Sequence, residues 1–86
     1  MNVPWRIETV KLAATKHFAL KYMRTWGWDY HDLRDALSAP FRVDKIGTDK
    51  YEVYVRKSGE KKIITVYLCD EDTLLCISAS RKGSSP

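Results

Sequence analysis

The sequence predicts an α+β domain in which two N-terminal helices pack on one face of a 3–4-stranded antiparallel sheet. Two observations lead to this prediction: helical periodicity dominates the first half of the chain, and alternating runs dominate the second. Helices grouped before an antiparallel sheet pack together on one of its faces. The 86 residues suffice for one small domain, with its core at about 7–82 and a loose tail at 83–86.

The first helix is expected from about Ile7 to Trp26. Apolar residues recur there at the three- and four-residue spacing of one helix face, and Gly27 suits a C-cap. Thr15 offers an alternative, because a threonine can cap a fresh helix and leave a bend near Ala14. The periodicity does not choose between one long helix and a shorter, capped one.

A second, shorter helix is expected from Trp28 and Asp29 onward, ending at Pro40. Asp29 can accept hydrogen bonds from the free amides of the first turn, and Asp32 adds negative charge near the positive end of the helix. The buried stripe of this helix is expected to consist of Leu33, Ala36 and Leu37.

The strands are expected to follow the helices. A short strand lies around 41–46, and three alternating runs cover 50–56, 63–69 and 74–82. Turn formers separate the three runs, which indicates a consecutive antiparallel meander.

Pairing the runs through two-residue hairpins gathers the apolar side chains on one face, as expected for a register set by a buried side. The facing pairs on that side are Val53 with Ile64, Tyr51 with Val66, Val66 with Ile77 and Leu68 with Leu75. The other face is expected to be uncovered, hydroxyl-rich and edged by cations. It carries Tyr54, Arg56, Thr65, Tyr67, Cys76, Ser78 and Ser80.

Composition argues against several classes of protein. Hydrophobic residues make up 44% of the chain, so disorder is not expected. No apolar run approaches the ~20 residues of a membrane helix and no signal peptide is visible, so a cytoplasmic location is expected. The sequence has no glycine-rich phosphate loop and no nucleophile elbow, and we expect neither a cofactor nor a metal.

The cysteines and histidines do not form a recognisable site. Cys69 and Cys76 are expected to be semi-buried thiols, because a Cys-x6-Cys pair without a nearby histidine is a poor zinc signature. His17 could act as an acid or base near neutral pH. His31 lies in the first turn of the second helix, where positive charge is disfavoured.

The net charge of +4 comes from 15 basic and 11 acidic residues. A basic small domain often binds a polyanion such as RNA or DNA. A solvated surface explains the same composition, since acidic residues are interspersed. Seven of the basic residues lie between 42 and 62: Arg42, Lys45, Lys50, Arg56, Lys57, Lys61 and Lys62.

The segment from Thr15 to Trp28, with His17, Met23 and Gly27, resembles the opening helix of small RelE/ParE-superfamily domains. Those domains carry a Thr-x-His-Ala…Arg-Met-x-x-Arg-Gly pattern. The stretch at 32–37 looks like their second helix, and the later runs look like their strands, so the resemblance covers roughly 15–82. Three features depart from the pattern: His17 lies six residues before Met23 where the family usually has five, and Tyr22 and Trp26 stand where the family has arginine.

The resemblance implies a RelE-like, RNA-binding toxin with metal-independent mRNA endonuclease activity and a cognate antitoxin. RelE-type enzymes use Arg, Lys and Tyr on the sheet and the C-terminal segment. The matching catalytic candidates here are Arg56 and Arg81 as phosphate clamps and Tyr67 as a stacking or acid/base group. The RNA-binding candidates are Tyr54, Lys57, Lys61, Lys62 and Lys82.

Two other functions remain open from the sequence. The same face could serve a non-catalytic nucleic-acid-binding module, or a Tyr-rich surface could make a homodimer of a small interaction domain. Each cation near a hairpin end also has an ordinary explanation, since Lys and Arg keep exposed turns soluble.

Overall fold

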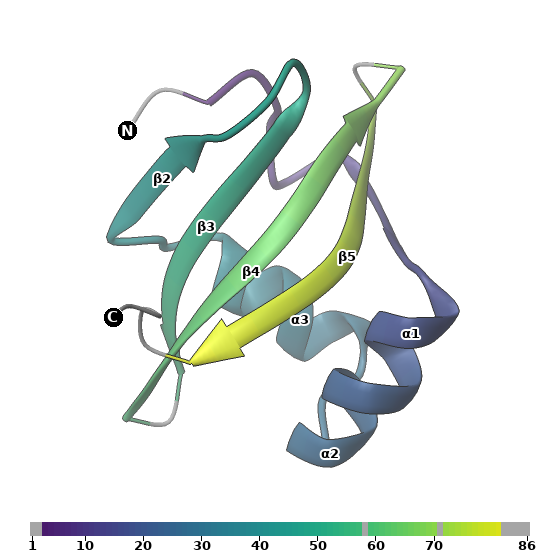
Figure 1. Cartoon of the computed structure of the whole chain (residues 1–86), viewed down its shortest axis with the longest axis vertical. Helices are drawn as coiled ribbons and strands as arrows, with labels where there is room; N and C mark the ends of the chain where they lie inside the picture. The colour runs from purple at the N-terminus through teal and green to yellow at the C-terminus, as the bar shows by residue number, and fades with distance from the viewer. Residues whose placement is uncertain (1–2, 58, 71, 82–86) are drawn as a thin grey trace.

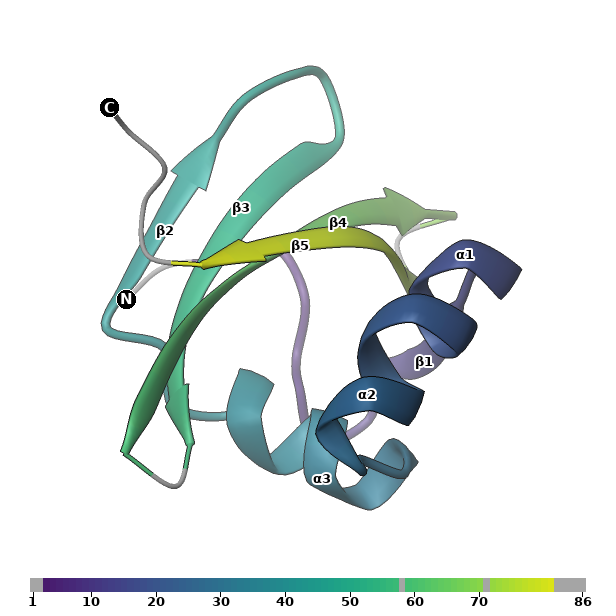
Figure 2. The same cartoon turned by 60° about the horizontal axis from the view of Figure 1, so that its bottom comes forward.

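The computed structural model describes residues 3–57, 59–70 and 72–81. Its five strands form one sheet in the order β1-β5-β4-β3-β2. Figures 1 and 2 show the helices together on one side of this sheet, so the fold is a two-layer α+β arrangement. In chain order the elements are β1 (Lys11–Ala14), α1 (Lys16–Phe18), η1 (Ala19–Met23), α2 (Arg24–Trp26), α3 (Tyr30–Leu37), β2 (Arg42–Lys45), β3 (Lys50–Lys57), β4 (Glu60–Cys69) and β5 (Thr73–Arg81).

The expected antiparallel sheet of three or four strands is wrong in strand number and in direction. A fifth strand, β1, pairs in parallel with β5, with Lys11 opposite Thr73 and Ala14 opposite Cys76. The Lys, Leu and Ala residues of β1 are good helix formers, so local propensity favours a helix there. Backbone pairing with β5 overrides that propensity, and no helix covers 7–14.

The helical stretch 16–26 begins after Thr15, which confirms the alternative of a capped, shorter helix. The Thr15 hydroxyl accepts a hydrogen bond from the Phe18 amide at 3.1 Å. Within the stretch, η1 is a π-helical segment, where the Arg24 amide donates to the Ala19 carbonyl five residues back. Gly27 ends the stretch at φ 74°, a left-handed conformation that favours glycine.

The second helix and its buried stripe are confirmed. Asp29 caps α3 by accepting from the Asp32 amide at 2.9 Å. The helix packs against β3 through its apolar side. All three residues expected in the stripe are buried: Leu33, Ala36 and Leu37.

The hairpin between β3 and β4 has the expected register. Val53 pairs with Ile64 and Tyr51 with Val66. Gly59, at φ 81°, lies in the connection and takes the positive φ that a two-residue turn requires. Alternation and turn chemistry therefore suffice to define this pairing.

The expected register between β4 and β5 is wrong. Leu68 pairs with Leu74 rather than with Leu75, because the connection spans 70–72 instead of two residues. The ladder then shifts between Thr65 and Val66, so that Val66 pairs with Cys76. Such a shift is a β-bulge, in which one strand carries an extra residue.

The shift changes the face on which residues of β5 lie. Cys76, expected on the uncovered face, is fully buried under the helices, and burial raises the pKa of its thiol to about 12. Leu75, expected in the core, lies opposite Tyr67 on the other face. Ile77 occupies the extra position, while Ser78 and Ser80 stay on the uncovered face.

The core lies between the sheet and the helices. An N-terminal segment completes it, because the ring of Trp5 contacts that of Tyr51 edge to face at 5.1 Å. Among the described residues, no helix is both long and apolar enough to cross a membrane. The largest fully buried side chains are Phe18, Leu33, Ile64, Leu74, Val53, Val55, Val66 and Cys76.

Replacing Thr15 by Ala is expected to destabilise the protein by about 1 kcal/mol, because the helical stretch loses its N-cap. A long helix through this position would be unaffected or stabilised, since Ala is the better helix former. Urea unfolding of wild type, Thr15→Ala and Thr15→Ser measures the effect. Thr15→Ser, which keeps the hydroxyl, should stay close to wild type, and an unchanged Thr15→Ala midpoint would contradict the capped start.

Candidate nucleic-acid interface

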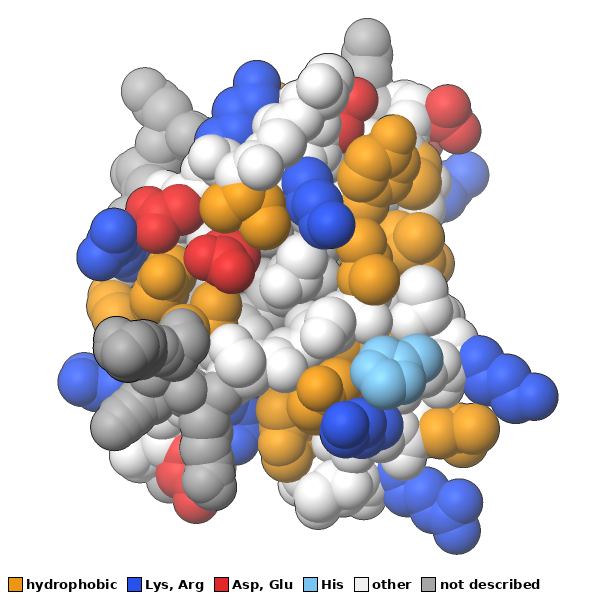
Figure 3. All heavy atoms as spheres, in the orientation of Figure 1, with side chains coloured by type: hydrophobic (Ala, Val, Ile, Leu, Met, Phe, Trp, Pro, Cys, Tyr) orange, Lys and Arg blue, Asp and Glu red, His pale blue; other side chains and the backbone are white. Residues whose placement is uncertain are grey.

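One face of the sheet has no helix packed against it. Figure 1 looks onto this face, with α3 behind the strands, and Figure 3 shows its side chains in the same orientation. Residues paired across a ladder share a face, so the register assigns its members. All the residues expected here except Cys76 are present: Tyr54, Arg56, Thr65, Tyr67, Ser78 and Ser80.

Two aromatic rings and three cations gather at one end of this face, where β2, β3 and β4 meet. The rings of Phe41 and Tyr54 lie 6.0 Å apart between centroids. The Arg42 guanidinium carbon lies 5.2 Å from the centre of the Tyr54 ring. Arg56 and Lys61 approach the Phe41 ring at 5.7 and 5.8 Å. We call these five residues the aromatic–cation cluster.

The cluster is accessible to a ligand. Phe41 is 48% exposed, and Arg56 and Lys61 are exposed beside it. These two cations face each other across the β3–β4 ladder and form no ion pair with any described residue. Arg42 differs, because its Nε donates to Asp44 at 3.0 Å. Two positive charges that form no ion pair with a described residue therefore flank an exposed ring.

The surroundings of Tyr54 keep its phenol protonated. Partial desolvation raises the pKa of Tyr54, and the nearby carboxylates of Asp44 and Glu52 raise it further. The Arg42 side chain acts in the opposite direction on the pKa of Tyr54 but does not cancel these effects. At neutral pH Tyr54 can donate a hydrogen bond or stack through its ring, and it is poorly suited to act as a base.

Tyr67 lies at the other end of the uncovered face. It is 41% exposed and stands between Lys50 and Leu75 in the ladders. It lies six positions further along β4 than Lys61, which is roughly 20 Å along an extended strand. Tyr67 and Arg56 therefore do not meet at one phosphate group.

Lys57, expected to contact RNA, lies on the helix side of the sheet. Its amino group donates to Asp35 on α3 at 2.9 Å and lies 3.9 Å from Asp32. This ion pair lowers the pKa of Asp35 and raises that of Lys57. Lys57 therefore joins the end of β3 to α3.

Lys62, a second expected RNA contact, is also on the helix side and is only 8% exposed. Its amino group lies 4.5 Å from the centre of the Trp26 ring and 5.9 Å from that of Trp28. The same group donates to Glu60 at 3.0 Å. The indole rings and one carboxylate stabilise the charge of Lys62. The amino group of Lys62 is therefore already engaged by partners within the chain.

The C-terminal candidates are only partly within the described structure. Arg81 is the last residue of β5, and its backbone pairs with Lys62. The side chain of Arg81 and all of Lys82 lie outside the described residues. Their roles remain predictions from the sequence.

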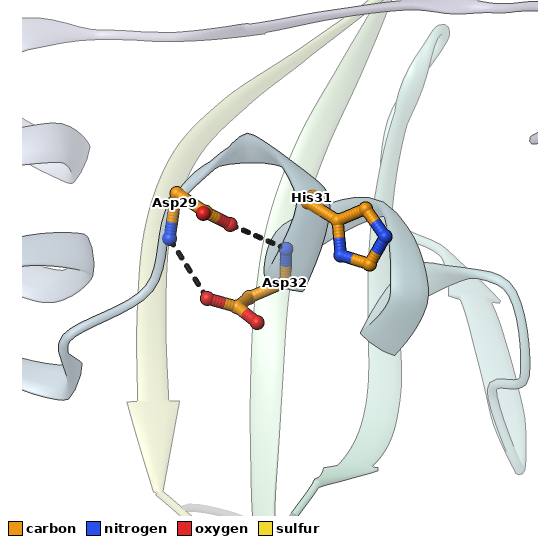
Figure 4. Close-up of side chains that lie close together, drawn as sticks. All are labelled: Asp29, His31 and Asp32. Atoms are coloured by element: carbon orange, nitrogen blue, oxygen red, sulfur yellow. Dashed lines mark hydrogen bonds between the residues drawn. The ribbon is translucent and has the colours of Figure 1, made fainter.

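Asp29, His31 and Asp32 lie close enough to hold a metal ion, with one ligand atom from each within 4.8 Å of the others (Figure 4). The two carboxylates already form the capping box of α3. The Asp29 amide donates to Asp32 at 3.0 Å, and the Asp32 amide donates to Asp29 at 2.9 Å. Capping explains this arrangement without an ion.

The sequence analysis missed the roles of Phe41 and Arg42. Both precede or begin β2, and only the pairing of β2 with β3 brings Arg42 opposite Tyr54. The available signal was an aromatic residue next to an arginine at the start of the short strand. An aromatic residue next to an arginine indicates a site only when the pairing of β2 with β3 is known, because that pairing brings both residues to Tyr54.

Comparisons with known proteins find no family model, curated protein or solved structure that matches this chain. The resemblance to the RelE/ParE superfamily stays a prediction.

Replacing Lys57 by Met is expected to lower stability most near neutral pH. The pKa of Asp35 lies below its ordinary value of 3.8, so the contribution of the ion pair is lost as the pH falls through that lowered pKa. The pKa of Lys57 lies above its ordinary 10.5, so the contribution is also lost as the pH rises through the raised value. Urea titrations of wild type and variant across this range measure the difference in unfolding free energy.

Lys45→Met, which removes an exposed cation on β2, is the control for this experiment. The difference in unfolding free energy between Lys45→Met and wild type should vary much less with pH than the difference between Lys57→Met and wild type. A Lys57→Met difference of constant size from acid to alkaline pH would contradict the ion-pair assignment.

Proposed function

We propose that this protein is a toxin-type RNA-binding protein that holds single-stranded RNA against the uncovered face of its sheet. The aromatic–cation cluster is the observation that carries this proposal. Single-stranded RNA offers unstacked bases and a charged backbone, which bind to aromatic rings and cations respectively. Phe41 provides an exposed ring, and Arg56 and Lys61, which form no ion pair within the described part of the chain, provide charges within 6 Å of it.

The remaining side chains of the face suit the same ligand. Arg56 can contact a phosphate with two parallel hydrogen bonds, while Lys61 acts as a point charge. The hydroxyl groups of Thr65, Ser78 and Ser80 lie on the same side and can pair with phosphates or with the ribose 2′-hydroxyl. Tyr67 offers a second ring at the far end for another base.

The toxin–antitoxin part of the proposal draws on the resemblance of 15–28 to RelE/ParE-superfamily domains. A toxin of this kind acts on mRNA in the cytoplasm and is held inactive by a cognate antitoxin. An acidic antitoxin segment over the cluster would bring carboxylates to Arg56 and Lys61. If mRNA is cut, Arg56 stabilises charge at the phosphate, and Tyr67 is too distant to transfer a proton there.

Arg56→Gln/Lys61→Gln is expected to weaken binding of a labelled 12-nucleotide RNA of mixed sequence more than tenfold at 50 mM KCl. The slope of log affinity against log salt should fall by about 1.4, since each phosphate contact to a single strand contributes about 0.7. Fluorescence anisotropy between 50 and 200 mM KCl measures both quantities.

Lys11→Gln/Lys45→Gln is the charge-matched control, because both lysines are exposed and neither belongs to the cluster. It should bind RNA with nearly wild-type affinity. Equal losses in the two double variants would mean that net charge alone drives binding, and the proposed interface would be wrong.

Phe41→Leu is expected to lower RNA affinity by about 1–3 kcal/mol through the loss of one stacked base. The salt dependence should not change, because no phosphate contact is removed. Tyr30→Leu is the matched control, since Tyr30 is equally exposed but lies on α3 in the opposite layer. If Tyr30→Leu lowers affinity as much as Phe41→Leu, the stacking assignment fails.

Cleavage is tested separately, by incubating the protein with free RNA and with ribosome-bound mRNA and by following growth on expression. Cutting and toxicity that Arg56→Ala and Arg81→Ala abolish would support the endonuclease. RNA binding without cutting in either assay would leave a non-catalytic binding module. No RNA binding, together with a concentration-dependent dimer in ultracentrifugation, would overturn the proposal.

A further inference from the structure

The exposed side of the helical stretch 16–26 carries cations and no acid. Lys16, Lys21 and Arg24 are exposed there, together with His17 and Leu20. No Asp or Glu occurs from 15 to 28, so this segment holds +3 of the chain's net charge of +4. Figure 3 shows Lys, Arg and His side chains at the lower right, where α1 and α2 lie in Figure 1. We call these five residues the helix patch.

Helix stability does not account for the helix patch. Exposed helices usually combine charges of both signs at a spacing of three or four residues, whereas here Lys21 and Arg24, three residues apart, have like charge. Lys16 and His17 lie in the first turn, where the helix dipole disfavours positive charge. Among the described residues, no ion pair involves any of the three cations. Only Arg24, near the C-terminal end, has a favourable position on the helix.

The aromatic side chains of this helix are packed against other side chains of the chain, and none is fully exposed. Phe18 is buried, and the Tyr22 ring contacts those of Phe18 and Trp26 at 5.6 and 5.5 Å between centroids. Tyr22 is half-buried, and its ring is also covered by two residues of the patch, with the His17 ring 5.7 Å and the Lys21 amino group 5.6 Å from its centre. The patch therefore offers charge without a freely exposed ring, unlike the uncovered face of the sheet. A ligand held by charge alone must present its phosphates and keep its bases inside.

We infer that the helix patch docks on the phosphate backbone of a nucleic-acid double helix. A duplex exposes phosphates along its outside and needs no stacking partner. An anionic membrane fits less well, because an interfacial helix inserts a broad apolar face. Here the apolar side is buried against the sheet, and Leu20 is the exposed large apolar residue of the stretch.

The helix patch and the aromatic–cation cluster belong to different parts of the fold. The patch lies on the helix layer, and the cluster lies on the uncovered face of the sheet (Figures 1 and 2). Binding of a duplex to the patch therefore does not need Phe41, Arg56 or Lys61. The inference is independent of the proposed contact with single-stranded RNA.

The test compares Lys16→Gln/Lys21→Gln/Arg24→Gln with Arg6→Gln/Lys11→Gln/Lys45→Gln. Both variants lose three exposed positive charges, so their net charges are equal. The probes are blunt 20-base-pair RNA and DNA duplexes of mixed sequence, titrated by anisotropy from 50 to 200 mM KCl. Far-UV circular dichroism melts check that both variants are folded.

The helix-patch variant should lose more than tenfold in duplex affinity at 50 mM KCl, while the control stays close to wild type. For the helix-patch variant, the slope of log affinity against log salt should fall by about 2.7, since each duplex phosphate contact contributes about 0.9. Affinity for the 12-nucleotide single strand should stay within twofold of wild type. The RNA and DNA arms show which duplex is the better ligand.

Three results would overturn the inference. The first is a wild-type protein that binds neither duplex, and the second is an equal loss in both triple variants. The third is a wild-type protein that binds phosphatidylserine vesicles or polyglutamate more tightly than the duplexes and loses that binding with the patch. Duplex binding that survives Arg56→Gln/Lys61→Gln separates this surface from the proposed single-strand interface.

Discussion

The register shift between β4 and β5 is the constraint on which both faces of the sheet depend. In an uninterrupted strand, Cys76 and Ser78 would lie on the same side. Because Ile77 takes an extra position, Cys76 completes the core while Ser78 lies on the uncovered face. The start of the helical stretch is held at the same point of β5. The Thr15 amide donates a hydrogen bond to the Cys76 carbonyl at 3.0 Å, and the Thr15 hydroxyl donates to the Ile77 carbonyl.

The basic residues of the β3–β4 hairpin do not form one patch, although they are close in sequence. Neighbouring residues of a strand point to opposite faces, so Arg56 and Lys61 face solvent while Lys57 and Lys62 face the helices. The inward pair is neutralised within the chain by carboxylates and indole rings. The outward pair keeps its charge beside Phe41. Strand alternation thus divides one basic segment between holding the layers together and offering a surface to a ligand.

The parts of the fold that local chemistry determines could be predicted from the sequence. The cap at Asp29 and the β3–β4 register follow from turn and capping residues and from period-two alternation. The strand at 11–14 could not be predicted, because its residues favour a helix and its pairing with β5 joins distant parts of the chain. The bulge at Ile77 has no local marker, and without it the faces of β5 are assigned wrongly.

The candidate interface, too, could be predicted only in part. Alternation alone placed Tyr54 and Arg56 on the uncovered face, since β3 and β4 pair locally. Phe41 enters the cluster only through the approach of β2 to β3, and the partners of Lys62 come from a helix end far away in the sequence. Charge counts therefore identified a basic domain, but three-dimensional pairing decides which charges are available.

The two outer strands of the sheet bear on how the protein behaves at high concentration. β1 and β2 have four residues each, and both carry charged side chains: Lys11 on β1, and Arg42, Asp44 and Lys45 on β2. A strand from another molecule that added to either edge would find few backbone groups to pair with and would have to desolvate these charges. Edge-to-edge growth into fibrils is thereby disfavoured.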